Sequence, residues 1–128
     1  MRLVFHPYFN HFPVAFFMLE AFLAFLWLRT KDEAYERFAY FTLKAALVVA
    51  PVAMVTGLID ARGLVPMVRP HFFAALTLIA AAFARFLWRH KSGRRVWEGK
   101  ALVGYVFLLA SSVFLTILTG HLGGKLVY

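Results

Sequence analysis

Five histidines carry most of the ligand-forming chemistry of this sequence. They are His6, His11, His71, His90 and His121. Imidazole is the commonest side-chain ligand of metal ions near neutral pH. The chain contains no cysteine, which excludes thiolate metal sites, cysteine-ligated iron–sulfur clusters and the CxxCH attachment of a c-type haem. Any metal or cofactor must therefore be held by histidine, by carboxylate or by packing.

Four long apolar stretches would position these histidines. They run over residues 12–28, 38–59, 72–88 and 101–118, and each is close to the ~20 residues that span a hydrocarbon core. Hydrophobic residues make up 62% of the chain and charged residues only 16%, which is untypical of soluble domains. We expect an all-α fold, an integral membrane four-helix bundle in up-down-up-down order. Its single transmembrane domain, 1–128, would have helices over about 12–29, 38–60, 71–89 and 100–119.

Two local patterns refine these helices. The first helix begins near Pro13, because proline is tolerated in a first helical turn, or near Pro7 with a kink at Pro13. Small residues at helical spacing predict faces where membrane helices approach closely. On the second helix these are Ala46, Ala50, Ala53, Gly57 and Asp60, and on the fourth they are Ser112, Thr116, Thr119 and Gly120.

Basic residues indicate which end of the bundle faces the cytoplasm. The first and third connections are flanked by Arg29, Lys31, Arg37, Lys44, Arg85, Arg89, Lys91, Arg94, Arg95 and Lys100. Only Arg2, Arg62, Arg69 and Lys125 fall on the other side. The positive-inside rule then places both termini outside, with Trp27, Trp88 and Trp97 as anchors at the cytoplasmic interface. The net charge is +8, but the basic residues are sorted by membrane side and do not form a patch for nucleic acid. We therefore expect membrane lipid as a partner and no nucleic acid.

The expected topology brings four histidines to the outer ends of three helices and leaves His90 in the basic cytoplasmic connection. We expect one or two haem b groups there, because the apolar macrocycle can be buried between helices. The first ligand pair is His11 with His71. His6 and His121 would bind a second haem or replace one member of the first pair. The alternative is a non-haem transition-metal ion bound by the same histidines.

Other outer residues fit the haem hypothesis. Haem propionates are anionic, and the cations at this end are Arg62, Arg69, Lys125 and Arg2. Gly57 and Gly120 would leave room for a flat ring. Asp60 stands at the negative C-terminal pole of a helix dipole, so it needs a cationic partner unless it caps the turn before Gly63.

Charged residues also lie inside the predicted spans, where ionisable groups are costly and therefore functional candidates. Glu20 could pair with Lys44 or with Arg85. A buried ion pair that locks adjacent helices is one interpretation. The other is a proton-relay carboxylate that serves a quinone-type reaction. No GxSxG, HExxH, Walker or GxGxxG motif is present, so an electron-transfer protein or subunit is expected rather than a stand-alone enzyme.

Four sequence segments together resemble a known family. They are HPYFNHFPVAF at residues 6–16, TGLIDARG at 56–63, His71, and TGHLGGKLVY at 119–128. They are similar to those of a bacterial four-helix membrane protein family catalogued as domain of unknown function twenty-two thirty-one. The resemblance covers the whole chain and implies a four-helix protein of the bacterial inner membrane. It implies no activity.

These observations predict a membrane b-type cytochrome with no catalytic residues. It would carry electrons between a periplasmic redox partner and the quinone pool or a partner subunit. A non-haem metal-binding membrane protein is the first alternative, and a cofactor-free structural subunit of a membrane complex is the second. Because the chain is short, we also expect association with copies of itself or with another membrane subunit.

Overall fold

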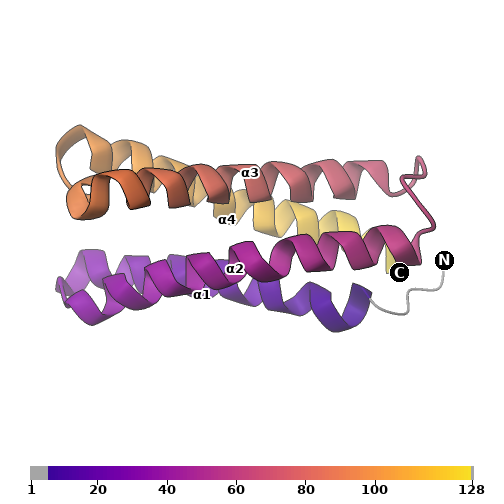
Figure 1. Cartoon of the computed structure of the whole chain (residues 1–128), viewed down its shortest axis with the longest axis horizontal. Coiled ribbons are helices and arrows are strands. Elements are labelled where there is room, and N and C mark those ends of the chain that lie inside the picture. The colour runs from indigo at the N-terminus through magenta and orange to yellow at the C-terminus, as the bar shows by residue number, and fades with distance from the viewer. Residues whose placement is uncertain (1–5, 128) are drawn as a thin grey trace.

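Four long helices run antiparallel to their neighbours along the chain (Figure 1). The computed structural model describes the backbone of residues 6–127 and the side chains of residues 11–124. The elements are α1 (His6–Thr30), α2 (Glu33–Asp60), α3 (Arg69–Ser92), the 3₁₀ helix η1 (Gly93–Trp97) and α4 (Gly99–Val127). All four long helices have the length and composition to cross a membrane. The predicted all-α, up-down-up-down bundle is confirmed within the described residues.

The helices are longer than the apolar stretches that predicted them. α1 begins at His6, next to Pro7, rather than near Pro13. α2 begins at Glu33, because Asp32 caps it by accepting a hydrogen bond from the amide of Ala34 at 3.0 Å. The start of α1 agrees with the second predicted alternative, a helix that begins near Pro7. A polar first turn with such a cap is a stable helix start, so counting apolar residues alone placed the start of α2 too late.

The C-terminal ends of the helices lie at or beyond the predicted last residues. α4 continues to Val127, past the glycines that the prediction treated as its end, because a helix satisfies its own backbone groups in an apolar setting. α2 does end at Asp60, as predicted. There the chain turns through Arg62 and Gly63, whose φ angles are 56° and 111°. The amide of Gly63 closes the end by donating to the carbonyl of Leu58 at 2.9 Å.

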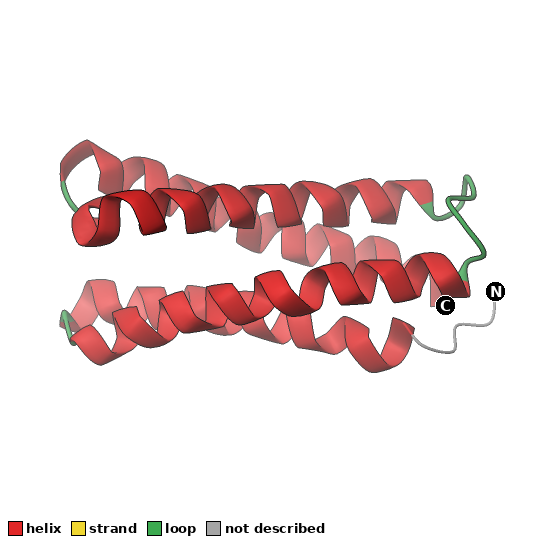
Figure 2. Ribbon diagram, in the orientation of Figure 1, coloured by secondary structure: helices red, strands yellow, loops and turns green. Residues whose placement is uncertain are grey.

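Each long helix packs against two others, so the helices form a square in cross-section. α1 contacts α2 and α4, and α3 also contacts α2 and α4, which leaves α1 and α3 on one diagonal. Figure 2 shows that the loops lie only at the two ends of the bundle. The core consists largely of small residues and a few large apolar ones, including Phe17, Leu43, Ala46, Leu78 and Ala82. Ala46, Ala50 and Ala53 are buried, which confirms the predicted packing face of α2.

The outer surface of the bundle is apolar. Large hydrophobic side chains are exposed on every long helix, among them Phe22, Phe41, Phe83 and Phe107. A surface of this kind is suited to contact with lipid and unsuited to water.

Candidate functional site

Four histidines belong to the end of the bundle where α1 begins, which is called the outer end because the positive-inside rule predicts that it faces outward. Of these, His71 is the one that the structure packs most closely into the bundle. It lies in the first turn of α3 and is half-buried. Its Nδ1 is 2.9 Å from the carbonyl oxygen of Thr119 on α4. A carbonyl oxygen can only accept, so Nδ1 must carry the proton and donate. In the neutral imidazole the lone pair then lies on Nε2, as in histidines that ligate metals.

Gly123 makes the close approach of the His71 ring possible. A Cβ atom built on Gly123 would lie 2.8 Å from Cε1 and 3.2 Å from Nδ1 of His71. Ser112, Thr116, Thr119 and Gly123 follow the spacing of one helical face, and its three polar members are buried. Gly120 is exposed and lies off this face. The prediction that Gly120 leaves room for a flat ring is therefore replaced by a contact at Gly123, where the missing side chain leaves room for the imidazole ring of His71.

Replacing Gly123 with alanine tests this contact. The new methyl group must displace the His71 ring, and overpacking of this kind typically costs about 1–3 kcal/mol of unfolding free energy. Gly120→Ala is the matched control, because an added Cβ there meets nothing within 4 Å. Alanine also favours a helix over glycine by up to about 1 kcal/mol, so the control should be neutral or slightly stabilised. Melting of both variants in detergent measures the difference, and equal melting temperatures would contradict the proposed packing.

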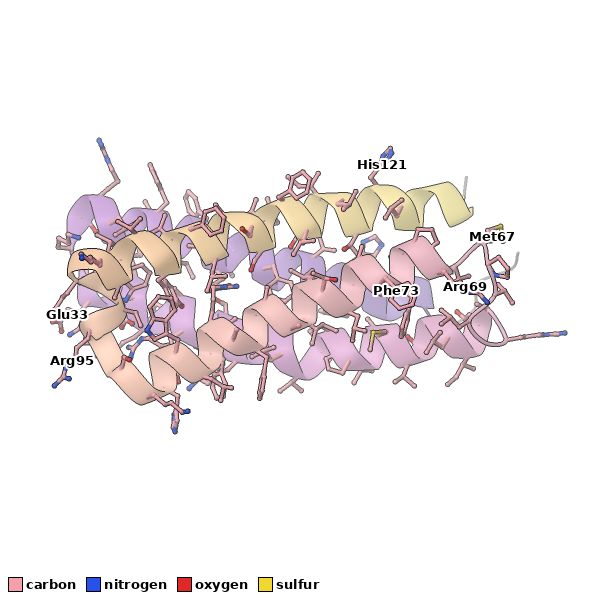
Figure 3. All side chains as sticks on the ribbon, turned by 90° about the horizontal axis from the view of Figure 1, so that it is seen from above. Glu33, Met67, Arg69, Phe73, Arg95 and His121 are labelled. Carbon is pink, nitrogen blue, oxygen red and sulfur yellow. The ribbon has the colours of Figure 1, made fainter. Side chains whose placement is uncertain are left out.

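The other outer histidines are less enclosed. His11 and His121 are exposed, and Figure 3 shows His121 pointing away from the bundle. The side chain of His6 lies outside the described residues. Among the residues whose side chains are described, 11–124, no group of three or more His, Cys, Asp or Glu residues is arranged to hold a metal ion.

The predicted supporting residues are also at the outer end. Arg62 and Arg69 are exposed, and Gly57 and Asp60 are half-buried near the end of α2. Figure 3 shows Arg69 beside Met67 of the α2–α3 connection, at the end of the bundle opposite Glu33 and Arg95. The side chains of Arg2 and Lys125 lie outside the described residues. The outer end thus combines one half-buried histidine with exposed cations and histidines.

A buried ion pair crosses the other half of the bundle. Both terminal nitrogens of the Arg85 guanidinium group, Nη1 and Nη2, donate to the carboxylate of Glu20, and the Nη2–Oε1 distance is 2.9 Å. Arg85 also donates through Nε to Ser112 Oγ at 3.2 Å. The exposed fractions are 0% for Arg85 and 2% for Glu20, so this charge pair is sealed from the surroundings. It joins the diagonal helices α1 and α3, whereas adjacent helices were expected.

Arg85 is therefore the partner of Glu20, and the predicted Glu20–Lys44 pair does not form. Lys44 is exposed on the outer face of α2, with its Nζ 4.6 Å from the centroid of the Tyr40 ring. The similar depths predicted for Glu20 and Lys44 favoured that pair, with Arg85 as the second candidate. The rotation of α2 about its axis, which turns Lys44 outward, decides between them.

A second buried carboxylate was missed by the sequence analysis. Glu36 is 2% exposed and accepts from Arg89 Nε at 2.8 Å and from Trp97 Nε1 at 3.4 Å. It stands before the apolar part of α2, outside the predicted spans in which charged residues were considered. Its spacing to Ala39, Leu43 and Ala46, which are all buried, is that of one helical face and could have indicated its burial.

The two carboxylates line one small cavity. Glu20 and Glu36 share it with Tyr40, Arg89, Trp97 and Tyr105, among others. Its size is on the scale of a single water molecule, and its walls offer several polar partners. A single water in this space would lie between the carboxylates of Glu20 and Glu36.

Tryptophans surround this polar region. Trp97 lies edge-on to Trp27 and Tyr105, with centroid distances of 6.3 and 4.9 Å, and Trp88 packs against Tyr105 at 5.9 Å. Trp97 is only 9% exposed. These rings lie at the basic end, as predicted, but Trp97 packs inside the bundle instead of anchoring at the membrane surface.

Comparison with known proteins yields one match. No curated protein and no solved structure matches the chain. The family model described as "Predicted membrane protein (DUF2231)" matches residues 2–128. The match covers nearly the whole chain and agrees with four helices able to cross a membrane. The chain therefore belongs to the DUF2231 family of predicted membrane proteins, the family that its terminal motifs resemble.

Proposed function

We propose that this membrane protein binds haem b at the end of the bundle where α1 begins, that His71 would hold the haem iron, and that the protein transfers electrons. The observation that carries the proposal is the hydrogen bond between His71 Nδ1 and the Thr119 carbonyl. Metal-ligating histidines characteristically donate their second ring nitrogen to a carbonyl or a carboxylate, which fixes the tautomer and the ring orientation.

Haem suits the small number of histidines at this end. The porphyrin would itself hold the iron, so the protein would have to add only one or two histidine ligands. His11 on α1 is the first candidate for the second ligand, and His6 and His121 are the others. When bound, the haem would supply reversible one-electron chemistry. The residues of the chain would hold and orient it, with Arg62 and Arg69 as partners for the propionates.

Sequence patterns support a position in the cell, and that position suggests redox partners. The positive-inside rule and the family resemblance favour the bacterial inner membrane, with the histidine end facing the periplasm. Electrons would then pass between a periplasmic partner and the quinone pool or another subunit. The cavity between Glu20 and Glu36 supports a proton-relay role for these carboxylates in a quinone-type reaction.

An absorption spectrum of the purified full-length protein tests the proposal. We expect a Soret band that sharpens on reduction with dithionite and an alpha band in the green, because haem b ligated by two histidines becomes low-spin ferrous. A pyridine haemochrome assay gives the number of haems per chain. A colourless protein from haem-supplemented cells, negative in this assay, would contradict the proposal, and elemental analysis would then test a non-haem metal.

A cofactor-free structural subunit is the second candidate. The exposure of His11 and His121 favours it, because polar side chains at helix ends can simply contact headgroups and water. A colourless protein that copurifies with another membrane subunit and lacks bound metal would support this role.

A further inference from the structure

Lys44 stands in an unusual place for a cation. It lies within the span of α2 and its side chain is exposed. Its neighbours on the same helical face are Phe41 and Val48, which are 63% and 70% exposed. In a membrane this face would contact lipid, so the ammonium group emerges among apolar side chains.

No carboxylate of residues 11–124 forms an ion pair with Lys44. Its contact is with the ring of Tyr40, one helical turn closer to the basic end. Side chains on a helix lean toward its N-terminus, so the ammonium reaches toward that end. A cation–π contact compensates only part of the cost of a charge on a lipid-facing surface. An anion from the surroundings would compensate the rest.

A second unpaired cation shares this face. Arg37 is exposed and precedes Lys44 by seven residues, or about 10 Å along the helix axis. It makes no ion pair with residues 11–124. On α3, Arg89 lies over the same Tyr40 ring, with Cζ 4.6 Å from the centroid, but Glu36 neutralises it. Near the Tyr40 ring, the cations without an ionic partner among residues 11–124 are therefore those of α2, Lys44 and Arg37.

We infer that Arg37, Tyr40 and Lys44 bind an anionic phospholipid. Its phosphate would pair with Lys44 and Arg37, and its acyl chains would lie along the exposed face of α2 that continues through Val48, Val52 and Val55. Only a ligand with both a negative headgroup and hydrocarbon chains complements two cations followed by an apolar face. This end of the bundle is also the one that the positive-inside rule assigns to the anionic leaflet.

Native mass spectrometry of the full chain in detergent tests this site. Phosphatidylglycerol and phosphatidylcholine with identical acyl chains are added separately, and the lipid-bound fractions are compared. We expect a preference for phosphatidylglycerol that falls about fivefold in Lys44→Gln, equivalent to the ~1 kcal/mol that one basic residue contributes near an anionic surface. Arg37→Gln should act in the same direction. Lys100→Gln is the matched control, because it removes an exposed lysine at the same end of the bundle from α4 and should change the preference little.

Several outcomes would overturn the inference. Equal losses in Lys44→Gln and Lys100→Gln would mean that net charge alone attracts the lipid. Equal binding of phosphatidylglycerol and phosphatidylcholine would show that the net negative charge of the lipid does not contribute to binding. Displacement of phosphatidylglycerol by inorganic phosphate would indicate a site that does not recognise acyl chains. A dimer that dissociates in Lys44→Gln would identify a second copy of the chain as the occupant of this face. Circular dichroism checks that each variant is folded. If Lys44→Gln does not fold, the lipid preference of Arg37→Gln tests the site instead.

Discussion

Replacing Arg85 with methionine is expected to lower the free energy of unfolding by about 3–5 kcal/mol, the usual cost of removing one partner of a buried ion pair. The variant leaves the Glu20 carboxylate, which is 2% exposed, without the two hydrogen bonds that Arg85 donates. A single water molecule in the adjoining cavity could not balance the charge that Arg85 neutralises. Unfolding in detergent by rising SDS or temperature, followed by tryptophan fluorescence, measures the loss.

Two further variants isolate the cause of this loss. The double variant Glu20→Met with Arg85→Met removes both charges, so it should recover much of the lost stability. Arg95→Met removes an exposed arginine at the same end of the bundle and should have little effect. A single variant as stable as the unchanged protein, or a double variant less stable than the single one, would show that the pair does not act as described.

Replacing His71 with alanine is expected to have the largest effect on cofactor content. If His71 is an axial ligand, the variant should lose haem, with the Soret absorbance per protein falling about tenfold or more, because even indirect supporting groups of metal ligands contribute 10–100-fold to affinity. The haem-to-protein ratio of the purified variant is the measurement. Circular dichroism should show the same helix content as in the unchanged protein.

The control for this prediction is His90→Ala. His90 is an exposed histidine at the basic end, stacked on Phe86, and its loss should leave the spectrum unchanged. His6→Ala, His11→Ala and His121→Ala then identify the second ligand, since only the variant that lacks it should shift or bleach the spectrum. A normal haem content in His71→Ala, when the unchanged protein does bind haem, would refute the ligand assignment while leaving the cytochrome itself intact.

Local patterns in the sequence were sufficient for the architecture. Apolar stretches of membrane-spanning length, joined by short connections, permit only antiparallel neighbours, and the structure has this order. The stripe of Ala46, Ala50 and Ala53 was readable from helical spacing, because spacing along one helix is a property of the chain alone. The boundaries were less accurate, since caps such as Asp32 extend a helix beyond its apolar residues.

The partners of the charged residues needed the tertiary structure. The sequence showed that Glu20 lies at a depth where an unpaired carboxylate is costly, and it offered Lys44 as the first candidate partner and Arg85 as the second. The rotation of each helix about its axis turns Lys44 toward lipid and Arg85 toward the bundle axis. That rotation depends on how all four helices pack together, so no single helix contains the information.

The sequence by itself determined that this protein has four helices suited to a membrane, with most basic residues at one end and four of its five histidines at the other. The tertiary structure alone decided that Arg85 reaches Glu20 across the diagonal, that Glu36 is buried, and that His71 packs on Gly123. The physical reason is the range of the interactions. Hydrophobicity and helical periodicity act along the chain, whereas hydrogen bonds and close contacts depend on distances of a few ångströms between segments far apart in sequence.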